Sequence, residues 1–153
     1  MLLGKSGIVL FLGLLKDTEM SQISKVQILD RKLISDERGW FFKPIIGYED
    51  GLPPYTGEIY LTMGLPGQSK GGHYHPEAVE WFTVIKGLAL LQLEDIETHE
   101  RVDIEMSLDK SITVYIPNKV AHVVKNIGSE DFILLAYTDK LYDPNDTISY
   151  VIR

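Results

Sequence analysis

The sequence predicts an all-β fold, a closed sandwich or barrel of antiparallel strands. Short segments rich in valine, isoleucine, threonine and aromatic residues follow one another, and turn-forming residues separate them at short intervals. No long stretch has the apolar period of an amphipathic helix. Strands of this length and spacing are typical of sandwiches and barrels such as the jelly roll.

Nine segments are expected to form strands, and all of them lie after residue 24. The expected strands cover residues 26–30, 39–46, 58–65, 79–87, 88–95, 102–108, 111–117, 121–127 and 131–138. Turn residues separate them, among them the glycines at 71–72. Residues 88–93 and 132–137 are apolar at nearly every position, which predicts burial on both faces by a second sheet or a second subunit. A homodimer is therefore expected.

Length and composition limit the possible classes of protein. A chain of 153 residues suits one domain, which we assign to residues 20–153, with residues 1–19 as an extension from an upstream start codon or an extra strand. Its apolar run is too short to span a bilayer. A net charge of -7 without a basic cluster argues against nucleic-acid and membrane partners, and the acidic cluster at 94–100 is interpreted as a solvated loop. The absence of cysteine excludes disulfides and fits a cytoplasmic location.

Three of the four histidines, with one glutamate, form a candidate site. His73 and His75 are two residues apart, so both rings face the same side of an extended strand. Glu80 begins the next expected strand, and His122 begins another after a proline turn. Three imidazoles and a carboxylate meeting inside a barrel would hold a divalent cation with two positions left open. Proton transfer and simple hydrogen bonding in a core remain the alternatives.

The spacing of these residues resembles the two motifs of the cupin family. The first motif, G-x5-H-x-H-x4-E-x6-G, is matched by Gly67, His73, His75, Glu80 and Gly87. The second, P-x4-H-x3-N, is matched by Pro117, His122 and Asn126, with Ser111 and Lys119 at its usual glycine positions. The resemblance implies the cupin double-stranded β-helix, a jelly-roll barrel. It also implies a metal ion (Zn, Fe, Mn or Ni) and no organic cofactor, with the ligands His73, His75, Glu80 and His122.

Three further segments resemble one branch of that family. SDERGWFFKP at 35–44, IPNKVAHVV at 116–124 and TDKLYDPND at 138–146 are similar to RmlC-like cupins, the relatives of dTDP-4-dehydrorhamnose 3,5-epimerase, and to sugar-nucleotide ketoisomerases. The implied activity is that of an isomerase of polysaccharide precursor biosynthesis. Such an enzyme removes the proton beside the ketone of a nucleotide-linked 4-keto-6-deoxy sugar.

The same resemblance implies roles for individual residues. His73 is the expected base and Tyr142 a candidate proton donor, while Arg38 and Phe41 would contact the nucleotide. Two further candidates for substrate binding come from the residues alone. They are Tyr60, whose alternative is ordinary packing, and Lys70, whose alternative is exposure to solvent.

The base and ligand roles of His73 compete, because a ring nitrogen that binds a cation cannot also accept a proton. With a metal bound, Glu80 or a bound hydroxide would be the base. Two other functions stay open: a metal-dependent cupin isomerase or dioxygenase of small molecules, and a non-catalytic sugar-binding cupin.

Overall fold

The computed structural model describes residues 21–36, 39–42, 44–45, 52 and 57–153. The predicted extension at residues 1–19 and the candidate Arg38 lie outside the described residues, as does the side chain of Phe41.

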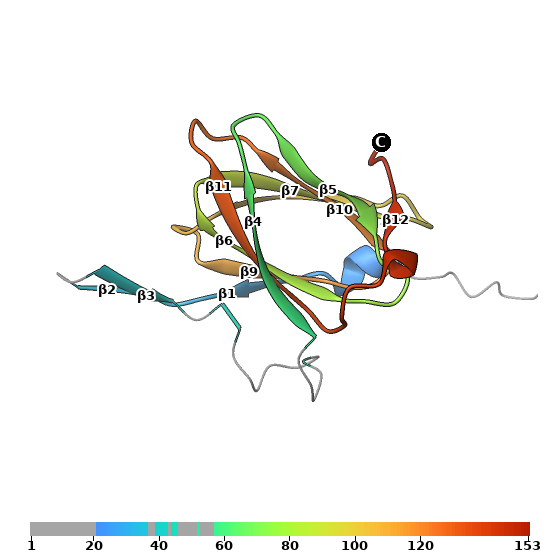
Figure 1. The fold of residues 1–153 in the computed structure, drawn as a ribbon, viewed down its shortest axis with the longest axis horizontal. Coiled ribbons are helices and arrows are strands. Elements are labelled where there is room, and N and C mark those ends of the chain that lie inside the picture. Colours follow the sequence, from blue (N-terminus) through green and yellow to red (C-terminus); the bar gives the residue numbers. More distant parts are fainter. Residues whose placement is uncertain (1–20, 37–38, 43, 46–51, 53–56) are drawn as a thin grey trace, which may run out of the picture.

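Two five-stranded antiparallel sheets face each other and form the body of the molecule (Figure 1). In order, the first sheet contains β1 (Gln27–Asp30), β9 (Ile112–Ile116), β6 (Glu80–Lys86), β11 (Phe132–Thr138) and β4 (Glu58–Gly64). The second contains β12 (Ile148–Ser149), β5 (Ser69–Tyr74), β10 (Val120–Asn126), β7 (Leu88–Asp95) and β8 (Arg101–Ser107). The predicted all-β fold is thus confirmed.

The remaining elements are small. A hairpin of β2 (Leu33–Asp36) and β3 (Gly39–Phe42) forms a separate two-stranded sheet beside the body (Figure 1). The helical elements in the described part of the chain are two short 3-10 turns, η1 (Gln22–Lys25) and η2 (Pro144–Asp146). Neither is long or apolar enough to cross a bilayer, and no other described segment is such a helix.

Alternate residues of the strands fill the space between the two sheets. On β7 the side chains of Ala89, Leu91 and Leu93 are fully buried, whereas their neighbours Leu88 and Leu90 are only partly buried. Side chains alternate across a strand, so one face of β7 lies in the core. Burying a leucine stabilises the fold by about 1.5–3 kcal/mol. This core holds the two sheets, and with them the site residues, at a fixed separation.

The prediction of a turn at residues 71–72 is wrong, because both glycines lie within β5. Gly71 and Gly72 have φ of 87° and 85°, which side chains rarely adopt. A Cβ on Gly71 would stand 2.7 Å from the carbonyl oxygen of His122 on β10. Glycine therefore allows β5 to approach β10 where the register shifts between His122 and Val123.

Ser111 and Lys119, which stand at the usual glycine positions of the second motif, adopt the left-handed backbone conformation that glycine favours. Ser111 has φ of 51° and Lys119 has φ of 62°. The amide of Lys119 also donates a hydrogen bond of 2.7 Å to the carbonyl oxygen of His75. The departures from the motif in sequence thus leave its left-handed turns intact, and the second of these turns supports a site residue.

The acidic cluster is not wholly solvated as predicted, since Glu94 and Asp95 are buried. Glu94 accepts hydrogen bonds from the hydroxyl of Tyr150 at 2.7 Å and from the amide of Arg153 at 3.0 Å. These donors offset the loss of water around the carboxylate. Glu94 therefore fastens the C-terminal residues to the outside of the second sheet.

Candidate active site

His73 and His122 face each other across two neighbouring strands. They are directly opposite in the β5–β10 register, and their Nε2 atoms are 3.1 Å apart. One ring nitrogen from each of these residues and one from His75 lie within 4.8 Å of one another. Neighbouring strands of the second sheet, with the residue that follows β5, therefore bring all three imidazoles to one point.

The carboxylate arrives from the opposite sheet. Glu80 is the first residue of β6, and its Oε2 lies 3.3 Å from Nε2 of His122 and 3.6 Å from Nε2 of His75. The loop at residues 75–79 connects β5 to β6, and it begins with His75 and ends next to Glu80. The four side chains that the motif spacing singled out thus meet inside the barrel.

Burial controls the charge of these groups. His122 is 2% exposed, and its burial, with the neighbouring His75, lowers its pKa to about 3. Burial and the adjacent His122 lower the pKa of His73 to about 4. Both rings are therefore neutral near pH 7, and each presents a nitrogen lone pair. Burial raises the pKa of Glu80, against the opposing influence of His75.

The two oxygens of Glu80 have different surroundings. Oε1 accepts a hydrogen bond of 2.9 Å from the hydroxyl of Tyr60 on β4. Burial, and then the charge of Glu80, raise the pKa of Tyr60, so its hydroxyl keeps its proton. Oε2 is buried and has no hydrogen-bond donor among the described residues. A buried carboxylate oxygen facing neutral ring nitrogens fits a divalent cation with mixed nitrogen and oxygen ligands.

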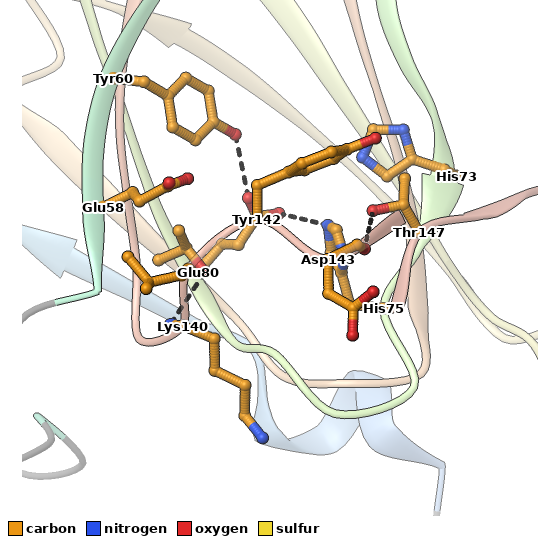
Figure 2. Close-up of a pocket in the computed structure, with 11 residues that line it drawn as sticks. Glu58, Tyr60, His73, His75, Glu80, Lys140, Tyr142, Asp143 and Thr147 are labelled. Atoms are coloured by element: carbon orange, nitrogen blue, oxygen red, sulfur yellow. Dashed lines mark hydrogen bonds and ion pairs between the residues drawn. The ribbon is translucent and has the colours of Figure 1, made fainter. Parts of the chain in front are cut away.

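A cavity of about 330 Å³ opens onto this cluster. Figure 2 shows Tyr60, Glu80, His73 and His75 around it, with Tyr142 among the residues of the C-terminal segment on its wall. Tyr142, the candidate proton donor, is 70% exposed. It therefore lies at the mouth of the cavity rather than beside the histidines in the core.

A second cavity of about 200 Å³ reaches the cluster between strands β4 and β5. The candidate Lys70 lines it together with Thr62, and His122 borders it as well. Tyr60 and His73 line both cavities. The imidazole of His73 is therefore accessible from two sides, and Lys70 is on the side away from Tyr142.

The sequence did not predict one contact of the cluster, the one between His75 and Asp146. The backbone carbonyl oxygen of Asp146, in η2, lies 2.6 Å from Nδ1 of His75. Its segment was noted only as part of a family-like tail, and a backbone carbonyl leaves no signature in residue types. Only the path of the chain after β11 could reveal it.

Residues 34–150 match the family model described as the polysaccharide biosynthesis C-terminal domain. The chain belongs to this family. The match spans both histidine motifs and the C-terminal wall of the larger cavity.

Two curated relatives have names from sugar metabolism. The chain is 26% identical over 121 residues to UDP-2-acetamido-2,6-beta-L-arabino-hexul-4-ose reductase of Pseudomonas aeruginosa, and the match covers 79% of this chain but 31% of that protein. It is 28% identical over 116 residues to the spore coat polysaccharide biosynthesis protein SpsL of Bacillus subtilis, covering 72% of this chain and 76% of SpsL. The chain thus spans under a third of the first relative and most of the second.

The architecture recurs in a solved epimerase. The chain superposes on dTDP-6-deoxy-D-glucose-3,5-epimerase RmlC of Legionella pneumophila, solved with dTDP-4-keto-L-rhamnose, with a TM-score of 0.74 and 21% sequence identity. The superposition covers 84% of this chain and 74% of the epimerase. The predicted jelly-roll barrel, which is the fold of this RmlC, is therefore confirmed.

Proposed function

We propose that this protein is a sugar-nucleotide epimerase or ketoisomerase of polysaccharide precursor biosynthesis. It moves the proton beside the ketone of a nucleotide-linked 4-keto-6-deoxy sugar. The observation that carries the proposal is the meeting of His73, His75, Glu80 and His122 at the inner end of a cavity in the barrel. The family of the chain and the names of its relatives support a substrate from this class.

The larger cavity suits a sugar ring. Ligand pockets begin at roughly 300 Å³, and this one has about 330 Å³. Its lining combines the hydroxyls of Tyr60 and Thr147 with the apolar side chain of Leu141. The oxygens of these hydroxyls, whose protons go to Glu80 and Asp143, can accept hydrogen bonds from a sugar. The mouth beside Tyr142 leaves room for the nucleotide outside the barrel.

Proton removal beside a ketone needs a base and a group that stabilises the negative charge on the ketone oxygen. His73 is neutral and borders the cavity, so its ring accepts the proton in the cation-free site. The nearby carboxylate of Glu80 favours the charged ring that results. Tyr142 at the cavity mouth is the proposed proton donor for the return step.

The proposal includes a divalent cation held by the three histidines and Glu80. When bound, such an ion acts as a Lewis acid toward a ketone oxygen. Tyr60 holds Oε1 of Glu80 and so leaves Oε2 directed toward the ring nitrogens. With the nitrogen of His73 and Oε2 of Glu80 occupied, Oε1 of Glu80 would be the proton acceptor.

Solvent exchange tests the reaction directly. After incubation with dTDP-4-keto-6-deoxyglucose or its UDP counterpart in deuterated water, we expect deuterium at C3, C5 or both. A His73→Asn variant should lose the exchange, because it lacks a base of comparable strength. Incorporation at neither carbon for either nucleotide, by a folded protein tested with and without added divalent metal, would exclude this substrate class.

We further propose that the chain acts in the cytoplasm as a homodimer. Alternate residues of the edge strand β4 expose apolar side chains on its outer face, among them Ile59, Leu61 and Met63. In the register of β4 with β11 these positions lie opposite further apolar residues, so the apolar surface extends over two strands.

Light scattering tests the dimer. We expect a mass of twice the 17.3 kDa chain for the wild-type protein. Leu61→Lys, at a side chain that is 63% exposed, should shift the protein toward the monomer without unfolding it. A monomeric wild-type protein at micromolar concentration would contradict the proposal.

A further inference from the structure

The C-terminal segment contacts the imidazole of His75 on the Nδ1 side, which faces away from Glu80. Its Nδ1 lies 2.6 Å from the carbonyl oxygen of Asp146 in η2. A carbonyl oxygen only accepts hydrogen bonds, so Nδ1 carries a proton, and in the neutral ring the lone pair is on Nε2. That lone-pair nitrogen is the one 3.6 Å from Oε2 of Glu80. The contact therefore fixes the tautomer that a cation ligand requires.

The side chain of Asp146 binds the loop between β5 and β6. Oδ1 of Asp146 accepts from the amide of Glu77 at 2.8 Å, and Oδ2 accepts from the amide of Ala78 at 3.0 Å. Oδ2 is also 3.9 Å from Nδ1 of His75. One aspartate thus holds both the ring of His75 and the loop that joins it to Glu80.

The segment that carries Asp146 also forms one side of the larger cavity. Tyr142 and Thr147, on either side of Asp146 in the sequence, both line the cavity (Figure 2). Immediately afterwards β12 pairs with β5, where Ser149 lies opposite His73. The cavity wall and the strand that bears the histidines are therefore linked at two neighbouring points.

We propose that Asp146 is a positioning residue that couples the ring of His75 to the C-terminal wall, residues 140–150. Through this coupling, a divalent cation bound at the histidine–glutamate cluster orders the wall over the cavity. The inference rests on the cation site of the proposed function and adds a link between occupancy of that site and the shape of the sugar pocket. Coupling of this kind is reciprocal, so an ordered wall tightens cation binding by the same factor.

Two substitutions of Asp146 and one matched control test the positioning role. Asp146→Ala removes both acceptors for the loop amides, and Asp146→Asn keeps one of them. Asp131→Asn is the control, because Asp131 pairs with Lys86 at the other end of β6. By chelator competition, we expect the affinity for Co²⁺ to fall about 10–100-fold in Asp146→Ala, as for other outer partners of metal ligands. The fall should be smaller in Asp146→Asn and absent in the control.

Two further readouts separate positioning from a general loss of structure. Asp146→Ala keeps the backbone carbonyl that faces Nδ1 of His75 but loses the side chain that fixes its position against the loop. Imidazole ¹⁵N spectra of the cation-free protein should therefore show His75 with its proton on Nδ1 in the wild type and a larger share of the other tautomer in Asp146→Ala. Backbone amide exchange in residues 140–150 should slow when Co²⁺ binds to the wild type, and less so in the variant.

Any of three results would overturn the inference. The first is a wild-type protein that binds no divalent cation, and the second is equal Co²⁺ affinity in Asp146→Ala and Asp131→Asn. The third is a rate of amide exchange in residues 140–150 that is the same with and without Co²⁺. None of these measurements uses a sugar. A failed solvent-exchange assay therefore counts against the proposed sugar chemistry alone.

Discussion

Replacing His122 with glutamine is expected to abolish tight divalent-cation binding and the proposed proton exchange together. His122 is buried, and its Nε2 is 3.1 Å from His73 and 3.3 Å from Glu80, so it lies between the other candidate ligands. Loss of an outer partner already weakens metal sites by about 10–100-fold, so loss of a ligand should cost on the order of 100-fold or more. Chelator competition measures the affinity, and deuterium incorporation measures the exchange.

His99→Gln is the matched control for this substitution. His99 is the one histidine of the chain outside the cluster, and its side chain is 56% exposed beside Glu94 in the turn between β7 and β8. We expect the His99→Gln variant to have the same cation affinity and the same rate of deuterium incorporation as the wild type. If His122→Gln retained wild-type affinity while folded, the cluster would not be the cation site.

Gly71→Ala is expected to destabilise the fold by about 2–6 kcal/mol, the sum of backbone strain and overpacking. Its φ of 87° disfavours any side chain, and the added Cβ would lie 2.7 Å from the carbonyl oxygen of His122. The strand β5 would have to move away from β10, which separates His73 from His122. Urea unfolding measures the loss of stability, and Co²⁺ affinity should fall with it.

Gly72→Ala separates the two contributions. Gly72 has nearly the same φ, 85°, but a Cβ there would meet nothing closer than a carbonyl oxygen at 3.8 Å. We expect this variant to lose only the strain contribution, about 1–3 kcal/mol, and to keep its cation affinity. Equal losses of stability in the two variants would show that the close approach of β5 to β10 contributes nothing.

The sequence predicted the site better than it predicted the strand that carries it. The spacing of His73, His75, Glu80 and His122 depends only on residue types, and all four meet as that spacing implies. Residues 71–72 were expected to form a turn because glycine is common in turns. Their actual role follows from the distance to β10, which no local pattern contains.

The features that were missed depend on contacts between distant parts of the chain. The sequence around Glu94 indicates a solvated acidic loop, but in the structure Tyr150 and Arg153 cover its carboxylate. The carbonyl of Asp146 reaches His75 across 71 positions of sequence. Tyr60 was a candidate for substrate binding with ordinary packing as the alternative, but its bond to Glu80 follows from β4 lying near β6 through their common neighbour β11. Such contacts are set by the closure of the barrel.

Anomalous diffraction from crystals grown with Co²⁺, recorded at the cobalt edge, tests the cation site most directly. We expect a single strong peak within bonding distance of ring nitrogens of His73, His75 and His122 and of Oε2 of Glu80. A peak held by other side chains, or none at this cluster when the crystal contains saturating Co²⁺, would contradict the assignment of these four residues as a cation site.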